Sequence, residues 1–179
     1  MTLSIRRATF ADAAIAVDIT RRNFTEAFGS HYPPEDLAYF LANRYSLAEH
    51  QRMLADPAYA LFLAQADGQL IGHALVGPCA LPHGDVAAAD GELKRLYLLP
   101  TAHNKGYGSA LLQTALGWLE QHGPRTLWVG VWSQNEGAQR LYARLGFEKV
   151  GDYFFAVGAT RDHEYILRRP AHGANHAKV

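Results

Sequence analysis

The stretch His103-Asn-Lys-Gly-Tyr-Gly-Ser109 joins an apolar run from Leu93 to Leu99 to a second apolar run from Ala110 to Gln121. The first run predicts a strand, and the helical spacing of leucines and alanines in the second predicts a helix. The stretch between them is therefore a glycine-containing turn that enters a helix. This arrangement indicates an α/β fold and marks a candidate binding site.

The turn has the properties of an anion-binding site. Backbone N–H groups in the first turn of a helix have no partner inside the helix, and together with the helix dipole they favour phosphate. Gly106 and Gly108 lack a β-carbon, so a diphosphate can approach the backbone closely, and Lys105 adds a mobile ammonium group. The P-loop pattern is absent, and Leu111 stands where the dinucleotide fingerprint requires a third glycine. An ordinary strand-to-helix turn stays the alternative.

A second motif, Asn135-Glu-Gly-Ala-Gln-Arg-Leu-Tyr-Ala-Arg-Leu-Gly-Phe147, follows later in the chain. With both motifs in this order, residues 3–169 resemble the GNAT superfamily of N-acetyltransferases, which use acetyl-coenzyme A. That family has Gln/Arg-x-x-Gly-x-Gly/Ala after its fourth strand and Asn-x-x-Ala-x-x-x-Tyr-x-x-x-Gly-Phe in a later helix. His103 departs from the family, which usually has Gln or Arg there.

The resemblance implies a mixed, mostly antiparallel central sheet of six to seven strands, flanked by helices and splayed at the coenzyme site. It also implies acetyl-CoA as co-substrate, with backbone groups near the splay hydrogen-bonding the pantetheine amides. The implied coenzyme-binding residues are Leu96, Tyr97, Leu98, His103, Asn104, Lys105, Gly106, Tyr107, Gly108, Ser109 and Asn135.

Acetyl transfer from a thioester to an amine needs a proton acceptor for the ammonium and a proton donor for the departing thiolate. Tyr142 is the candidate acid, because the matched motif places a phenol there; the alternative is that it belongs to an apolar helix stripe. Glu92, at the start of the strand before the turn, is the candidate base. The motif does not carry this position over, and a carboxylate paired with Lys94 or a neighbouring arginine is the alternative.

The N-terminal third interleaves aromatic and acidic side chains, a composition that suits a cationic amine. Its pattern resembles bacterial polyamine acetyltransferases, so we expect a small primary amine as acceptor. The alternative is that most of these aromatic rings belong to two amphipathic helices and serve only to pack them on the sheet. Rival functions are a protein or peptide N-acetyltransferase and a non-catalytic acyl-CoA-binding sensor. The residues concerned are Phe24, Glu26, Phe28, His31, Tyr32, Glu35, Asp36, Tyr39, Phe40 and Tyr45.

Composition limits the other classes. A chain of 179 residues with zero formal net charge and a pI of about 7.1 is long enough for one core and gives no sign of a nucleic-acid surface. We expect a cytoplasmic protein without membrane contact. The sequence has a single cysteine, Cys79, and shows neither a signal peptide nor an apolar run of about 18 residues. The nine histidines show no metal-ligand spacing, so no metal is expected. The family resemblance leaves a homodimer open.

No repeat or linker divides the chain, so we predict one domain over residues 1–169 and a disordered tail over residues 170–179. Helices are expected within 12–24, 33–43, 46–55 and 110–121, with another after a capping box at Ser133 to Glu136. Residues 77–91 are expected to form a loop. Strands are expected at 5–9, 59–65, 69–76, 92–99, 126–132, 150–157 and 161–167.

Overall fold

The computed structural model describes residues 2–171, which form seven strands, five α-helices and three short 3-10 turns. The strands are β1 (Leu3–Arg7), β2 (Ala60–Ala66), β3 (Gln69–Pro78), β4 (Gly91–Leu98), β5 (Leu127–Trp132), β6 (Glu148–Val157) and β7 (Thr160–Arg169). The α-helices are α1 (Ala13–Phe28), α2 (Pro34–Arg44), α3 (Leu47–Ala55), α4 (Tyr107–Leu119) and α5 (Glu136–Arg144). The 3-10 turns are η1 (Phe10–Asp12), η2 (Gly29–His31) and η3 (Pro100–Ala102).

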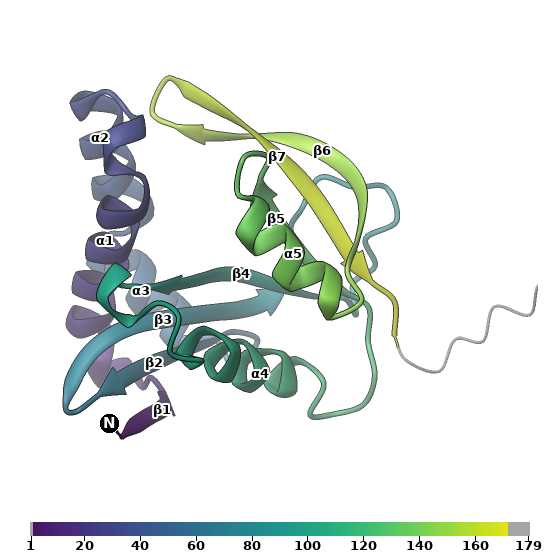
Figure 1. Ribbon diagram of the computed structural model, residues 1–179, viewed down its shortest axis with the longest axis horizontal. Helices are drawn as coiled ribbons and strands as arrows, with labels where there is room; N and C mark the ends of the chain where they lie inside the picture. Colours follow the sequence, from purple (N-terminus) through teal and green to yellow (C-terminus); the bar gives the residue numbers. More distant parts are fainter. Residues whose placement is uncertain (1, 172–179) are drawn as a thin grey trace, which may run out of the picture.

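All seven strands form one sheet in the order β1-β2-β3-β4-β5-β7-β6 (Figure 1). Every neighbouring pair is antiparallel except β4 and β5, which are parallel. The parallel ladder is short, ending at the pair Leu93 and Val129, although both strands continue beyond it. The mixed, splayed sheet predicted from the sequence is thus confirmed. Strands from both ends of the described chain, β1 and β7, join this one sheet, and the single domain over residues 1–169 stays a prediction.

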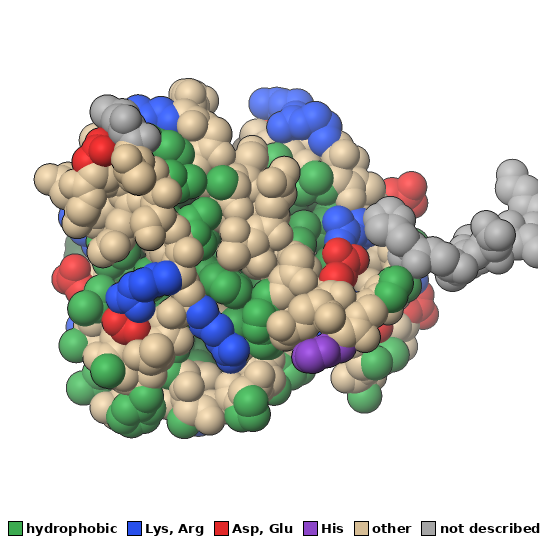
Figure 2. Space-filling model, turned by 90° about the horizontal axis from the view of Figure 1, so that it is seen from below, with side chains coloured by type: hydrophobic (Ala, Val, Ile, Leu, Met, Phe, Trp, Pro, Cys, Tyr) green, Lys and Arg blue, Asp and Glu red, His purple; other side chains and the backbone are tan. Residues whose placement is uncertain are grey.

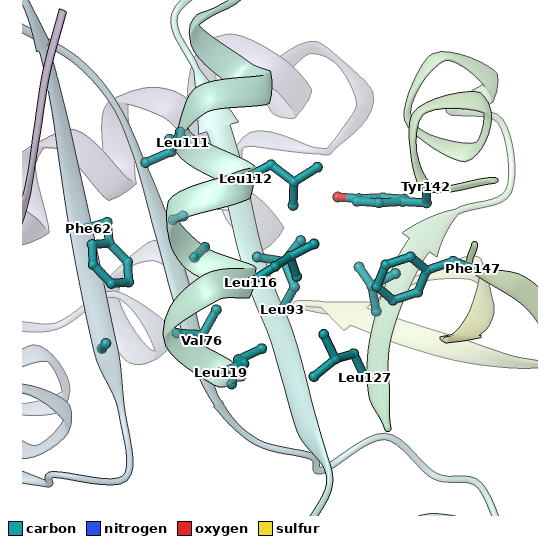
Figure 3. Packing of buried hydrophobic residues seen from close by; sticks show 14 of the residues in the cluster. Phe62, Val76, Leu93, Leu111, Leu112, Leu116, Leu119, Leu127, Tyr142 and Phe147 are labelled. Atoms are coloured by element: carbon teal, nitrogen blue, oxygen red, sulfur yellow. The ribbon is translucent and has the colours of Figure 1, made fainter. Parts of the chain in front are cut away.

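The sheet separates two hydrophobic cores. In β2, Ala60, Phe62 and Ala64 face one core, while Leu61 and Leu63 face the other, as the alternation of side chains along a strand requires. The first core is covered by α4 and α5, and Figure 3 shows leucines of α4 packed between the sheet and the aromatic rings of the α5 region. The second core is covered by α1 and α3.

Helix α2 closes a third cluster together with α1 and the end of β6. Phe24 lies at its centre and stacks on Phe40 with ring centroids 4.7 Å apart. Asp36 of α2 also accepts hydrogen bonds from the backbone of Ala159 and Thr160 in the β6–β7 turn. These contacts hold the N-terminal helices against the C-terminal hairpin.

Several predicted boundaries are wrong, for local reasons. Helix α4 begins at Tyr107, before the predicted Ala110, because Gly106 adopts a φ of 77° and caps the helix. The cap of α5 is Asn135, whose Oδ1 accepts the Ala138 N–H at 3.1 Å, and the predicted cap at Ser133 is incorrect.

Other predicted elements differ mainly in length. Helix α1 continues past the predicted residue 24 to Phe28, and β3 continues to Pro78, into the predicted loop. The cap at Ser46 is confirmed, since its Oγ accepts the Glu49 N–H. The tail prediction for residues 172–179 lies outside the described residues.

The surface carries mixed charge. On the face shown in Figure 2, basic and acidic side chains are scattered around hydrophobic ones, and the described side chains form no continuous patch of one sign there. Within residues 2–171, no helix combines the length and apolar character needed to cross a membrane.

Candidate active site

A cavity of about 860 Å³ lies where β4 and β5 diverge. It is lined along β4 from Glu92 to Leu98 and along β5 from Val129 to Trp132. Beyond the last ladder pair the two strands no longer bond to each other, so the cavity can be approached from both faces of the sheet.

The two faces differ in character. Leu96 and Leu98 pack toward the core under α4 and α5. Tyr97 points the other way, where its ring meets Phe28 of α1 at a centroid distance of 5.8 Å. The strand β4 therefore presents an aliphatic side toward α4 and an aromatic side toward α1.

The predicted anion-binding turn lies at the aliphatic side. Gly106 has φ 77° and Asn104 φ 60°, so the turn uses two left-handed residues before α4 starts. A β-carbon on Gly108 would stand 3.2 Å from Leu98 Cδ1, which means that glycine lets α4 approach β4 closely. The first N–H groups of α4 have no partner inside the helix and are available to an anion.

The side chains of the turn divide into free and engaged groups. Lys105 and Ser109 are exposed, whereas Tyr107 is half-buried. His103 turns its ring back onto the strand, and its Nε2 donates to the Leu98 carbonyl at 3.0 Å. His103 therefore already has a partner, and the predicted phosphate contact would require its release.

The backbone beside the cavity is partly free, and this corrects one prediction. The Leu99 N–H donates to the Ile71 carbonyl of β3 at 2.8 Å. Peptide groups of alternate residues face the same side of a strand, so those of Tyr97 also face β3. In this part of β4, Leu96 and Leu98 direct their peptide groups toward the gap, where the Leu98 carbonyl accepts the His103 bond, and Tyr97 contributes its ring.

The candidate acid Tyr142 reaches the cavity from α5. Figure 3 shows its hydroxyl oxygen pointing toward α4 and Leu112. Tyr142 is 6% exposed, and its ring centroid lies 5.8 Å from that of Phe147. Burial raises the pKa of the phenol, which therefore stays protonated at neutral pH. Tyr142 belongs to the apolar cluster and also lines the cavity, and its role as the acid stays a prediction.

The candidate base Glu92 lines the cavity, but its charge is already compensated. Its Oε2 accepts the Ala80 N–H at 2.8 Å and the Lys94 ammonium at 2.8 Å. The pairing with Lys94 is the alternative raised by the sequence. Asn135, the predicted coenzyme contact, lines the cavity while its Oδ1 caps α5.

The aromatic residues predicted to bind the acceptor divide into two groups. Those that line the cavity with Glu26 are Phe24, Phe28, Tyr32, Phe40 and Tyr45. The others do not: Tyr39 is 65% exposed, His31 packs edge-on against Trp132, Asp36 bonds the β6–β7 turn, and Glu35 is exposed outside the lining.

The sequence interpretation missed a group of polar residues on β6 and β7. Glu164 lines the cavity and accepts a hydrogen bond from the Tyr153 hydroxyl, and Asp162 accepts one from Tyr32. Burial raises the pKa of the Glu164 carboxyl. Asp162, Glu164 and the buried Ile166 are spaced by two residues and so share one face of β7. This spacing was the signal available in the sequence.

Comparisons with known proteins agree with this geometry. The sequence model of the acetyltransferase (GNAT) family matches residues 17–147. An uncharacterized N-acetyltransferase of Mycobacterium tuberculosis is 34% identical over 88% of this chain and 97% of its own length.

Two solved structures share the fold. The PaiA N-acetyltransferase of Thermoplasma acidophilum, in complex with coenzyme A, has a TM-score of 0.75 at 21% identity, over 95% of this chain and 99% of its own. YncA of Salmonella typhimurium, a putative acetyltransferase solved with acetyl-CoA, has a TM-score of 0.64 at 21% identity, over 95% and 94%.

Proposed function

The chain belongs to the acetyltransferase (GNAT) family of acetyl-coenzyme A-dependent N-acetyltransferases, and we propose that it acetylates a small primary amine by direct attack on the thioester. The observation that carries this proposal is the cavity at the splay of β4 and β5. One face of that gap offers unpaired amides and a buried phenol, and the other offers aromatic rings and carboxylates.

The coenzyme is proposed to bind on the side of α4 and α5. The free N–H groups at the start of α4 suit its pyrophosphate, and Asn104, Lys105 and Ser109 lie within reach of the same anion. The Leu96 peptide groups and the Leu98 N–H that face the gap suit the pantetheine amides, whereas the Leu98 carbonyl is bonded by His103. This path leads from the turn toward Tyr142, whose hydroxyl makes no hydrogen bond to any residue in 2–171.

The chemistry then requires two proton transfers. An alkyl ammonium of pKa about 10.4 is neutral in roughly one molecule in a few thousand at pH 7, a cost of about 4–5 kcal/mol. A basic group on the acceptor side must take that proton. After the amine attacks the acetyl carbon, the C–S bond breaks and Tyr142 protonates the departing sulfur.

The acceptor side suits a small cation. Its walls are aromatic, and Asp162 and Glu164 are carboxylates that form no ion pair with the described residues. These features support the polyamine class predicted from the sequence. Cytoplasmic location and a homodimer stay predictions.

Acetylation assays test the acceptor class. The protein and acetyl-CoA are incubated with spermidine, with other small primary amines and with peptides that have a free N-terminus or lysine. We expect turnover with the small amines, whereas turnover with peptides alone would overturn the proposal. Calorimetric binding of acetyl-CoA without acetylation of any amine would instead favour an acyl-CoA sensor.

A further inference from the structure

Glu164 occupies a special position beside the gap between β4 and β5. It stands on β7 opposite Trp132, the last residue of β5, and its carboxylate lines the cavity. Strand β5 has no side chain at Gly130, where a β-carbon would lie 3.1 Å from Glu164 Oε2 and closer still to the Tyr153 hydroxyl. Gly130 thus provides the space in which the Tyr153–Glu164 pair reaches the cavity.

Glu164 is bonded by a neutral group rather than by a cation. Its hydrogen-bond partner is the neutral Tyr153 phenol, and within residues 2–171 it forms no ion pair. Asp162 on its own strand and Glu92 on β4 are the nearby carboxylates, and both disfavour its charge. Arg95 on β4 stacks over the Tyr45 ring instead, at 4.3 Å.

Glu92 is in the opposite situation, because a single oxygen of its carboxylate binds an ammonium and a backbone N–H. Both lone-pair positions that these donors use are closed to an incoming acceptor amine. A desolvated carboxylate without a cation binds a proton more readily and attracts an incoming ammonium more strongly. Of the two glutamates that line the cavity beside the gap between β4 and β5, Glu92 and Glu164, Glu164 has the environment of a base.

We propose that Glu164, positioned by Tyr153 and by the space at Gly130, is the catalytic residue that binds the acceptor ammonium and takes its proton. This inference rests on the proposed function. The ammonium transfers one proton to Glu164, the resulting amine attacks the acetyl carbon, and the C–S bond breaks. Tyr142 gives a proton to the sulfur and regains one from the attacking nitrogen through water. Glu164 releases its proton to solvent after the acetylamine leaves.

The main test is the pH dependence of Glu164→Gln, which keeps a carbonyl oxygen for the Tyr153 hydroxyl. We expect kcat/KM for the amine to fall by about 100-fold at pH 7. The loss should shrink as the pH approaches the amine's own pKa of about 10.4, where free amine no longer needs a base. A merely structural role would lower the rate equally at all pH values. Asp152→Asn is the matched control, on the same hairpin but in the exposed group with Lys149 and His163.

Two further measurements separate binding from proton transfer. Calorimetry with coenzyme A present, which cannot react, should show weaker amine binding by Glu164→Gln and unchanged binding by Asp152→Asn. Tyr153→Phe removes a hydrogen bond that favours the carboxylate, so the acidic limb of the pH profile should move to higher pH.

The outcomes distinguish this inference from the function on which it rests. If the wild-type protein acetylates no amine, the proposed function fails. If it does, and Glu164→Gln keeps the wild-type rate and pH profile, only the assignment of Glu164 is overturned. Loss of the acidic limb in Glu92→Gln rather than in Glu164→Gln would assign the base to Glu92.

Discussion

Gly130→Ala tests the site by filling space on β5 without removing any charged group. The new β-carbon would lie 3.2 Å from Tyr153 Cζ and 3.1 Å from Glu164 Oε2, with the Tyr153 hydroxyl closer still. Ordinary contacts between such atoms are about 3.5 Å, so the phenol must move by about 1 Å.

The expected effects on stability and on rate are very different. Small rotations of the Tyr153 side chain move its hydroxyl by this amount, and alanine is preferred over glycine in a strand interior by about 0.5–1 kcal/mol. We therefore expect the free energy of unfolding to change by no more than about 1 kcal/mol. Glu164 is bonded to the Tyr153 hydroxyl and is expected to move with it. A reacting group displaced by about 1 Å loses on the order of 100-fold in rate, so kcat/KM for the amine should fall by about that factor.

The assay compares steady-state kinetics and urea unfolding for Gly130→Ala and for a control, Gly117→Ala. Gly117 is exposed on α4 and a β-carbon there would meet no atom within 4 Å, so this variant should gain stability and keep full activity. A stable Gly130→Ala protein with wild-type kcat/KM would refute the claim that the acceptor amine reacts beside Tyr153 and Glu164.

Three other substitutions test separate parts of the structure. Tyr142→Phe should lower kcat by about 10²–10⁴ in steady-state assays, with unchanged calorimetric affinity for acetyl-CoA; a small effect would exclude the phenol as the acid. Gly106→Ala places a side chain at φ 77°, which costs about 1–2 kcal/mol. Calorimetry should then show weaker binding of acetyl-CoA, and an unchanged affinity would place the pyrophosphate elsewhere. Hydrogen bonds from Arg6 and Thr9 hold the pKa of the Asp12 carboxyl well below its usual range. The charged carboxylate therefore stabilises the fold above its ordinary pKa of about 3.9, and this contribution disappears as the pH falls toward the folded value. Asp12→Asn should flatten the loss of stability that urea unfolding measures below about pH 4.

The sequence predicted the architecture well because its signals are local. Hydrophobic periodicity and turn residues identified all seven strands, and the family motifs implied the splay. Helix starts were less accurate, since they depend on single dihedral angles. Gly106 could be read as a flexible turn residue, but the sequence does not show that its left-handed φ starts α4 at Tyr107.

The acceptor side was harder to predict because it is assembled from distant segments. Tyr32 meets Asp162, and Tyr153 meets Glu164 across a hairpin, so no local motif records either pair. An acidic residue in a late strand resembles an ordinary solvent-exposed position. Its spacing from buried Ile166 is a weak signal, and the β5–β7 register, which places Glu164 opposite Trp132 at the gap, is what distinguishes it.

The divergence of β4 and β5 begins at a β-bulge in β4, close to the ion pair of Glu92 with Lys94. The register between β3 and β4 shifts at Leu75, so that Lys94 is left without a partner in β3. Lys94 directly follows Leu93, the last residue of β4 that pairs with β5. A β-bulge bends its strand and increases the local twist, so this extra residue turns β4 away from β5 where the cavity begins.

The Glu92–Lys94 ion pair spans that bulge, and Glu92 also holds the Ala80 N–H of the loop that leads toward β4. These bonds give Glu92 a role in shaping the gap. Glu92 is thus engaged within the paired part of β4, next to the point where the strands diverge. The proposed role of taking the acceptor's proton falls to Glu164 across the gap, which has no such partners within residues 2–171.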